Sequence, residues 1–245
     1  MKAIILAAGK GTRLNGVDLK PKCLFEVGGE TLLARQVAAL RELHVNDIVI
    51  VLGFEAERIR RLYEHTASFI INSRFEETSS LYSLWLAKEH LLDGFVVLNC
   101  DVLFHPQLLE RLLSSPFDDA LLVDLVDKHN NQLGDEEMKV KVSDGLVVDI
   151  RKDLDPAEAD GENVGIVKFS ASGAQRLVEE MDGIISRGQL KDWAPRAFRE
   201  FARRFPLHAI STGDYPWIEI DFPEDYRRAK EEVFPQIDAM ADSRV

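Results

Sequence analysis

The chain opens with Met1-Lys-Ala-Ile-Ile-Leu-Ala-Ala-Gly-Lys-Gly-Thr-Arg-Leu14 and continues, from residue 21, with Pro21-Lys-Cys-Leu-Phe-Glu26. Residues 2–6 form a short apolar run rich in isoleucine, which predicts a buried strand. Small residues follow the strand at once. Gly9 and Gly11 allow the backbone to turn tightly and to approach a ligand, and the N–H groups of their neighbours can point at an anion. The pattern predicts a strand that leads into a ligand-binding turn.

Four cationic side chains lie beside this turn, in a chain whose formal net charge is −12: Lys10, Arg13, Lys20 and Lys22. A local basic patch in an acidic protein indicates that a small polyanion binds here. The alternative is a glycine-rich turn with a solvated basic loop, because such turns are common in open α/β sheets.

Two familiar phosphate-binding motifs do not fit the turn. The dinucleotide-binding fingerprint needs a third glycine where this chain has Leu14, and it needs a helix that opens at the second glycine. A P-loop needs Ser or Thr after its lysine, whereas Lys10 is followed by Gly11. The sequence therefore excludes both motifs.

Composition limits the class of protein. The 245 residues, 46% of them hydrophobic, are enough for one α/β domain, which we assign to residues 1–235, with a tail at 236–245. Two cysteines, Cys23 and Cys100, cannot make a disulfide framework, which favours a reducing, cytoplasmic setting.

The first apolar run is too short for a signal peptide, and no segment approaches the length of a membrane helix. A pI near 5 argues against a nucleic-acid partner.

Strand and helix patterns alternate after the turn, which predicts parallel strands joined by right-handed crossovers. Ligands bind at the carboxyl ends of the strands in such sheets, and the glycine turn lies at that edge. We expect strands at 47–53, 68–72, 95–101, 120–126, 162–170 and 207–211, and a hairpin at 135–151 that turns at Asp144-Gly145. We expect helices at 30–43, 55–63, 80–92, 175–181 and 191–203, and a final amphipathic helix after Pro223.

Two aspartates end predicted strands. Asp101 closes the strand at 95–101, where a carboxylate that faces a triphosphate would hold Mg²⁺ together with phosphate oxygens. Asp221 follows Trp217 and Glu219 at alternate positions, so both carboxylates lie on one face of a strand. Each aspartate has a competing explanation, namely that it caps the helix that follows.

Other polar residues allow two interpretations. Ser79 and Ser80 could contact a nucleotide or merely cap a helix. Lys139 and Lys141 alternate with valines, so that either lysine could bind the acceptor's phosphate, although a solvated sheet face is the commoner explanation. Glu162 at the start of a strand is most simply a solvent contact.

The turn resembles the signature of the nucleotidyltransferases that activate sugar phosphates and alkyl phosphates. That signature reads L-A-A-G-x-G-T-R-L, then a short loop and P-K, and it matches residues 6–14 and 21–24. The branch that acts on choline phosphate has further motifs that are similar to residues 72–84, Gly161-Glu-x-x-Gly165 and Trp217-x-Glu-Ile-Asp221. The resemblance implies an α/β fold, a single-domain Rossmann-like mixed sheet of the glycosyltransferase-A type, with a small lobe of β-hairpin and helix that binds the acceptor.

The resemblance also implies the reaction and the site. An acceptor phosphate oxygen would attack the α-phosphorus of a nucleoside triphosphate and expel pyrophosphate, which requires positioning and charge neutralisation but no side-chain nucleophile. Arg13 would stabilise the leaving phosphates, Lys22 would act at the α-phosphate, and Mg²⁺ would lie on Asp101 and Asp221. The expected nucleotide-binding residues are Leu6, Ala7, Ala8, Gly9, Gly11, Thr12, Arg13, Lys22, Ser79, Ser80 and Asp101.

The partners expected from this resemblance are CTP and a phosphocholine-like alcohol or phosphonate. Aromatic residues that could surround a quaternary ammonium are Tyr82, Trp85, Trp193, Tyr215 and Trp217. Carboxylates that could instead pair a primary ammonium, or the hydroxyls of inositol phosphate, are Glu162, Asp192 and Glu219. The substrate-binding set is thus Tyr82, Lys139, Glu162, Asp192, Trp193, Trp217 and Glu219.

Two alternatives to a cytidylyltransferase remain open from the sequence. A sugar-1-phosphate or inositol-phosphate nucleotidyltransferase would carry the same turn and aspartates. A nucleotide-binding regulator without catalysis is a further class, and the presence of Arg13, Lys22, Asp101 and Asp221 speaks against it. The oligomeric state is not fixed, and a homodimer is one option.

Overall fold

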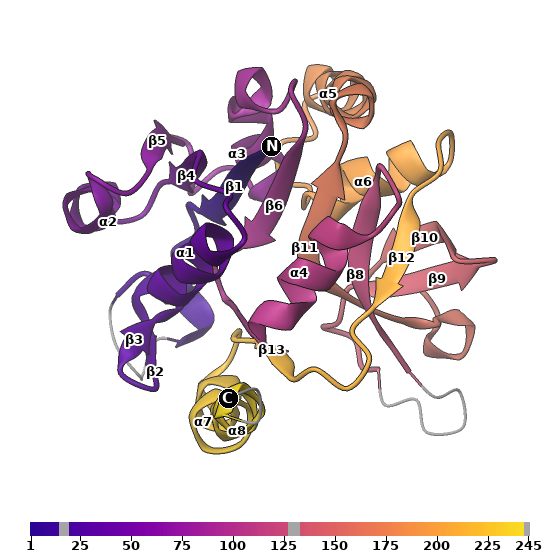
Figure 1. The fold of residues 1–245 in the computed structure, drawn as a ribbon. Coiled ribbons are helices and arrows are strands. Elements are labelled where there is room, and N and C mark those ends of the chain that lie inside the picture. The colour runs from indigo at the N-terminus through magenta and orange to yellow at the C-terminus, as the bar shows by residue number, and fades with distance from the viewer. Residues whose placement is uncertain (15–19, 127–132, 243–245) are drawn as a thin grey trace.

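The structure is a computed structural model, and it describes residues 1–14, 20–126 and 133–242. A nine-stranded mixed sheet runs through the molecule in the order β5-β4-β1-β6-β11-β8-β12-β10-β9 (Figure 1). Its strands are β1 (Lys2–Ala7), β4 (Ile48–Leu52), β5 (Ser68–Ile71), β6 (Phe95–Asn99), β8 (Ala120–Leu125), β9 (Lys139–Ser143), β10 (Leu146–Arg151), β11 (Gly161–Phe169) and β12 (His208–Ser211).

The first four strands pair in parallel, as the strand and helix alternation predicts, and β11 then pairs antiparallel with both β6 and β8. The hairpin of β9 and β10 turns at Asp144 and Gly145, both with positive φ, and it continues the main sheet through β12. Two small sheets lie outside the main sheet: β2 (Glu26–Val27) with β3 (Glu30–Thr31), and β7 (Val102–Phe104) with β13 (Trp217–Glu219). The strand predicted around Trp217 and Glu219 is β13, although it ends before Asp221, whereas β2, β3 and β7 were not predicted because they are only two or three residues long.

Helices cover both faces of the sheet, so its central strands β1, β4 and β6 are buried on both sides. One face packs against α1 (Leu32–Glu42), α2 (Ala56–Tyr63) and α4 (Pro106–Ser114). The other face packs against α3 (Ser80–Leu86), α5 (Ala171–Ser186) and α6 (Pro195–Ala202). Of the described helices, none combines the length and the apolar character that crossing a membrane requires.

Several boundaries differ from the predicted ones for local reasons. Helix α5 is longer than expected, because the Ser170 hydroxyl accepts a hydrogen bond from the Gly173 N–H and caps its start. Helix α6 begins at Pro195, where proline suits the first helical turn, rather than at residue 191. Helix α3 ends at Leu86, and a 3₁₀ turn follows it.

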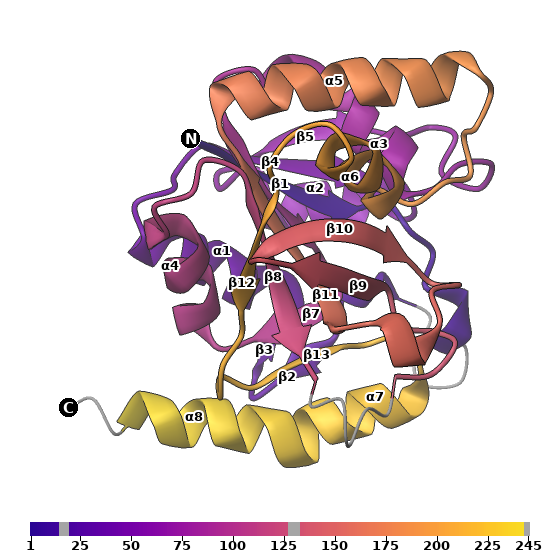
Figure 2. The ribbon, with the colours of Figure 1, turned by 90° about the vertical axis from the view of Figure 1, so that its right-hand side faces the viewer.

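The C-terminal helices close the lower end of the molecule. Figure 2 shows α7 (Pro223–Arg228) and α8 (Phe234–Asp242) along the end opposite α5. Ile237 of α8 is buried in a third core cluster, which it shares with Leu14 and Phe25 of the N-terminal segment. The assigned tail is therefore helical through Asp242, and its last three residues lie outside the described part of the chain.

Gly165 occupies an irregular point of β11, where the register with β8 shifts. Its φ is +82°, and an added Cβ would lie 2.7 Å from the Nδ2 atom of Asn99. Gly188 has a similar φ of +76°, but a Cβ added there would have no other atom within 4 Å. Alanine substitutions at the two glycines therefore distinguish the cost of backbone strain from the cost of steric crowding.

We predict that Gly165→Ala lowers the free energy of unfolding by about 2–3 kcal/mol, because strain and displacement of Asn99 add. Gly188→Ala should cost only about 1 kcal/mol, from strain alone. Urea denaturation of both variants measures the difference. Equal losses of unfolding free energy in the two variants would show that the Asn99 side chain moves aside at no energetic cost.

Candidate active site

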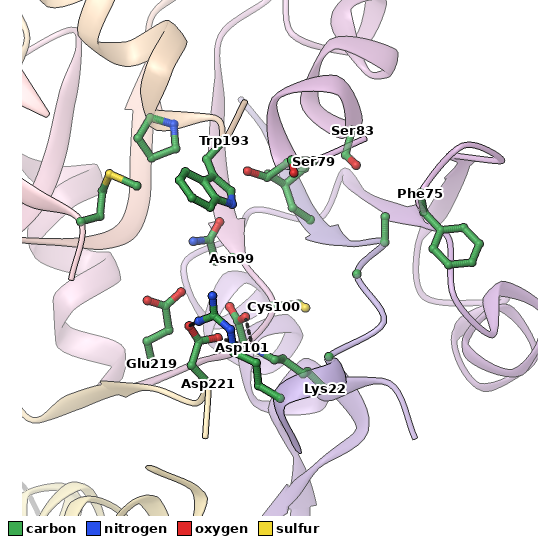
Figure 3. Close-up of a pocket in the computed structure, with 18 of the residues that line it drawn as sticks. Lys22, Phe75, Ser79, Ser83, Asn99, Cys100, Asp101, Trp193, Glu219 and Asp221 are labelled. Atoms are coloured by element: carbon green, nitrogen blue, oxygen red, sulfur yellow. Dashed lines mark hydrogen bonds and ion pairs between the residues drawn. The ribbon is translucent and has the colours of Figure 1, made fainter. Parts of the chain in front are cut away.

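A cavity of about 350 Å³ opens at the carboxyl ends of β1 and β6. Figure 3 shows acidic side chains and Lys22 at one end of it, with Trp193 and Ser79 at the other. Its lining combines segments from along most of the chain: Leu6, Ala8, Gly9, Gly11, Thr12, Arg13, Lys22, Asn72, Phe75, Thr78, Ser79, Ser80, Ser83, Asn99, Cys100, Asp101, Glu136, Met138, Lys152, Asn163, Trp193, Pro195, Glu219 and Asp221.

The glycine turn forms one wall of the cavity. Gly11 has a φ of +61°, and an added Cβ would lie 2.7 Å from the Cγ atom of Lys22. Only glycine therefore lets the turn pack this closely on the lysine stem. A short 3₁₀ helix, Thr12–Leu14, follows, and its buried Leu14 anchors the loop in the third core cluster.

Lys22 lies in a second 3₁₀ helix, Lys22–Leu24, which is fixed by the buried side chains of Cys23 and Leu24. Its ammonium lies 3.2 Å from Oδ2 of Asp101 and also donates to Oδ1 of Asp221. Burial acts to lower the pKa of Lys22, but the two carboxylates outweigh it and hold the pKa above its ordinary value. Lys22 is therefore charged at any physiological pH.

Neither aspartate caps a helix, so the competing explanation for each is wrong. His105 is the N-cap of α4, and its Nδ1 accepts a hydrogen bond from the Gln107 N–H. At the start of α7, the carboxylate of Asp225 accepts hydrogen bonds from the N–H groups of Asp221 and Phe222. The carboxylates of both Asp101 and Asp221 are thus left to face the cavity.

Glu219 joins the two aspartates. One carboxylate oxygen from each of Asp101, Glu219 and Asp221 lies within 4.8 Å of the others. Burial, together with the charges of the two aspartates, holds the pKa of Glu219 well above its usual range. A cluster of hard oxygen donors with surplus negative charge fits a hard divalent cation such as Mg²⁺.

Arg13 reaches the same cluster from the glycine turn. Its Nη1 lies 3.0 Å from Oδ2 of Asp221 and 3.1 Å from Oε2 of Glu136. The same Glu136 oxygen lies 3.3 Å from the ammonium of Lys152. The cations that surround the cavity are thus paired with carboxylates across it, and an incoming polyphosphate would exchange with those carboxylates.

A network of small polar groups lines the other end of the cavity. The amide of Asn72 donates to the hydroxyls of Thr78 and Ser83, at 3.0 Å each. Ser79 is at the N-cap position of α3 without a side-chain capping bond, and the Ser80 hydroxyl accepts a hydrogen bond from the Ala194 N–H. The hydroxyls that line this wall therefore do not cap α3.

The predicted nucleotide-binding residues lie together around the cavity, except that Ala7 does not line it. Of the predicted acceptor-binding residues, Trp193 and Glu219 line the cavity, whereas Tyr82, Lys139, Glu162, Asp192 and Trp217 do not. Trp217 donates through Nε1 to Asp124, and Tyr82 packs against Trp85. Lys139 is only 1% exposed, so the solvated sheet face expected for it is wrong.

Lys152 is a cavity residue that the sequence patterns missed. It follows the last residue of β10, and its ammonium lies 5.0 Å from the centre of the Trp193 ring. The buried ammonium of Lys139 donates to the backbone oxygen of Lys152 at 2.6 Å. Lys139 thus holds the backbone at Lys152 in place. No local pattern in the sequence indicates this role, because Lys152 reaches the cavity through contacts with Glu136 and Trp193 across the fold.

Comparisons with known proteins identify the family of the chain. The family model described as "MobA-like NTP transferase domain" matches residues 3–133. The chain is 28% identical over 234 residues to the choline-phosphate cytidylyltransferase of Streptococcus pneumoniae, which covers 94% of this chain and 97% of that protein. It is 29% identical over 232 residues to the bifunctional IPC transferase and DIPP synthase of Aquifex aeolicus, covering 93% of this chain but only half of that relative.

A solved structure gives the same result for the fold. The CTP:phosphocholine cytidylyltransferase from Streptococcus pneumoniae superposes with a TM-score of 0.76 at 24% identity, and the match covers 94% of this chain and 97% of that one. This likeness confirms the mixed α/β nucleotidyltransferase fold that the sequence predicts.

Glu162 provides a test of the site's electrostatics. Burial, then the nearby carboxylates of Glu137 and Asp124, raise its pKa from 4.5 to about 8. An acid whose pKa is higher in the folded state destabilises that state as pH rises from its unfolded pKa to its folded pKa. The cost is therefore absent well below pH 4.5, grows as the pH rises from there, and is complete above about pH 8.

We predict that Glu162→Gln raises the thermal midpoint at pH 9, by the equivalent of about 1–3 kcal/mol, and that this gain shrinks towards pH 5. Thermal unfolding across this pH range measures it. Glu179→Gln, on the exposed surface of α5, is the matched control and should show no pH-dependent gain. A gain that does not vary with pH would contradict the raised pKa.

Proposed function

Because the chain belongs to the family of MobA-like NTP transferase domains, we propose that this nucleotidyltransferase uses Mg²⁺ to join CTP to a small phosphorylated alcohol or phosphonate, with release of pyrophosphate. The relative from Streptococcus pneumoniae supports CTP as the donor, because its name states that activity and the match extends over nearly all of both chains. The acceptor and the base are the proposed part, whereas the class of enzyme follows from the family.

One observation supports the proposal above all others. The ammonium of Lys22 lies between Asp101 and Asp221, at the end of a cavity that the glycine turn also lines. Transfer of a nucleotidyl group brings two anions together, so the enzyme must mainly position them and neutralise their charge. A charged lysine beside a carboxylate cluster and a cationic turn provides these functions.

The roles of the chain's own residues follow from their positions. The backbone around Gly9 and Gly11 would hold the triphosphate, and Arg13 would exchange Asp221 for the phosphates that leave. Lys22 would donate to the α-phosphate as negative charge develops there. Asp101 and Asp221, with Glu219 beside them, would hold Mg²⁺, which supplies charge neutralisation at the α-phosphate.

We assign the acceptor's phosphate to Lys152 rather than to Lys139. Lys152 lines the cavity, whereas Lys139 is buried beneath it and donates to its backbone. Lys152 pairs with Glu136, which itself also contacts Arg13. An entering phosphate would replace Glu136 on Lys152, just as the triphosphate replaces Asp221 on Arg13.

The residues that line the cavity also bear on which head group the acceptor carries. A quaternary ammonium needs several aromatic rings around it, yet of the five aromatic candidates only Trp193 lines the cavity. The ammonium of Lys152 already lies over the Trp193 ring, and a second cation there would be repelled. The carboxylate of Glu136, which pairs with Lys152, and the amide of Asn163 also line the cavity. These features favour a head group with N–H or O–H donors over choline.

We predict that CTP with phosphoethanolamine or 2-aminoethylphosphonate gives a kcat/KM at least about tenfold above CTP with phosphocholine, which corresponds to about 1.4 kcal/mol. The measurement is pyrophosphate release with CTP, UTP, GTP and dTTP against these acceptors, inositol 1-phosphate and glucose 1-phosphate. A preference for glucose 1-phosphate or inositol 1-phosphate would establish the sugar-phosphate or inositol-phosphate alternative. Absence of pyrophosphate release with every pair would favour a regulator without catalysis.

We predict that Lys22→Ala lowers kcat by about a hundredfold or more, because loss of a preorganised donor to developing charge costs ~3 kcal/mol. Steady-state kinetics with the best pair from the panel measures this. Lys141→Ala is the control, since Lys141 pairs with the exposed Glu158 outside the cavity and its loss should change kcat less than about threefold. A kcat for Lys22→Ala close to that of the control would refute the role.

A further inference from the structure

Gln36 is a polar residue on the buried side of α1. Its neighbours on that side, Leu33, Val37 and Leu40, belong to the core, and Gln36 itself is only 1% exposed. An amphipathic helix ordinarily places an apolar side chain at such a position. A buried carboxamide is costly unless its polar atoms are paired, so its presence needs a physical reason.

The side chain of Gln36 makes two hydrogen bonds to one turn. Its Nε2 donates to the backbone oxygen of Asn99 at 2.9 Å and to that of Val102 at 3.0 Å. These carbonyls flank Asp101, in the turn that connects β6 and β7. The orientation of the amide is determined by chemistry, because the reversed amide would put its oxygen against both carbonyls.

The other half of the amide is unsatisfied. Among the residues that the structure describes, Oε1 of Gln36 is buried and has no hydrogen-bond partner. A methionine has the same length and would avoid that cost. The property that sets glutamine apart at this position is therefore its pair of N–H donors, and both are directed at the turn that carries Asp101.

The same turn also connects to the second aspartate. The backbone oxygen of Asp101 accepts a hydrogen bond at 2.9 Å from the N–H of Ile220, the residue before Asp221. The turn is thus held from one side by Gln36 and from the other by the strand that leads into Asp221. Loss of the Gln36 bonds would loosen the position of one carboxylate directly and of the other through this contact.

We propose that Gln36 is a positioning residue for the carboxylate cluster: its carboxamide fixes the turn at 99–102 so that Asp101 faces Lys22 and Asp221. This role rests on the proposed function, because it concerns the residues assigned to Mg²⁺. Gln36 is not among the residues that line the cavity. It acts only through the backbone that carries Asp101.

The test measures metal binding apart from turnover. Mn²⁺ serves as a paramagnetic probe, and its binding to the enzyme with CTP is followed by electron paramagnetic resonance without any acceptor. Gln36→Met keeps the length of the side chain and removes both donors. We expect its Mn²⁺ dissociation constant to rise by about 10–100-fold, which is typical when a group that orients a metal ligand is lost. With the acceptor added, kcat should fall while the KM for the acceptor stays nearly constant.

Ala38→Gly is the matched control, because Ala38 is an exposed position on the same helix and glycine weakens a helix interior. It should lower the thermal midpoint without changing Mn²⁺ binding. Should Gln36→Met not fold, Gln36→Asn, which is too short to reach both carbonyls, should show the same loss of Mn²⁺ affinity.

Wild-type Mn²⁺ affinity in a folded Gln36→Met or Gln36→Asn variant would overturn the positioning role and leave the proposed function intact. Absence of Mn²⁺ binding in the wild-type enzyme with CTP would instead overturn the metal site of the proposed function, and the role of Gln36 with it.

Discussion

The ammonium of Lys22, held between Asp101 and Asp221, is the interaction on which the site depends. It joins segments that are 79 and 199 residues apart in the chain. A buried charge is tolerated only when its partners are well placed, so these three side chains constrain one another's positions. Glu219 adds a third carboxylate, and its pKa is raised first by burial and then by the negative charges of Asp101 and Asp221, which Lys22 only partly offsets. The remaining negative charge of the carboxylate cluster therefore favours the binding of one more cation.

The same pairings explain how an acidic protein can bind a polyanion. Arg13 contacts Asp221 and Glu136, and Lys152 contacts Glu136. Each cation is kept in place by a carboxylate that phosphate oxygens can replace without moving the lysine or arginine far. Preorganisation of this kind lowers the cost of ordering long side chains when substrate enters.

The sequence predicted the parts of the site that local chemistry dictates. Gly11 and Lys22 belong to a motif with a fixed spacing, and Asp101 and Asp221 end or follow strands at the sheet edge where ligands bind. Lys139 shows where this approach fails, because strand periodicity indicates which face a residue occupies but not what covers that face. Lys152 and Gln36 gain their importance from contacts across the fold, which no local pattern encodes.

The third core cluster combines the two ends of the chain, since Leu14 and Phe25 pack with Ile218 and Ile237. Local segments of the main sheet can form early, but closing a loop of this size must wait until both ends are present. During synthesis on the ribosome, Leu14 and Phe25 thus emerge before Ile218 and Ile237, and the third core cluster stays incomplete until those residues have been made. Catalytic competence consequently comes only after the segment that carries Asp221 has been synthesised and has packed against the segment that carries Lys22.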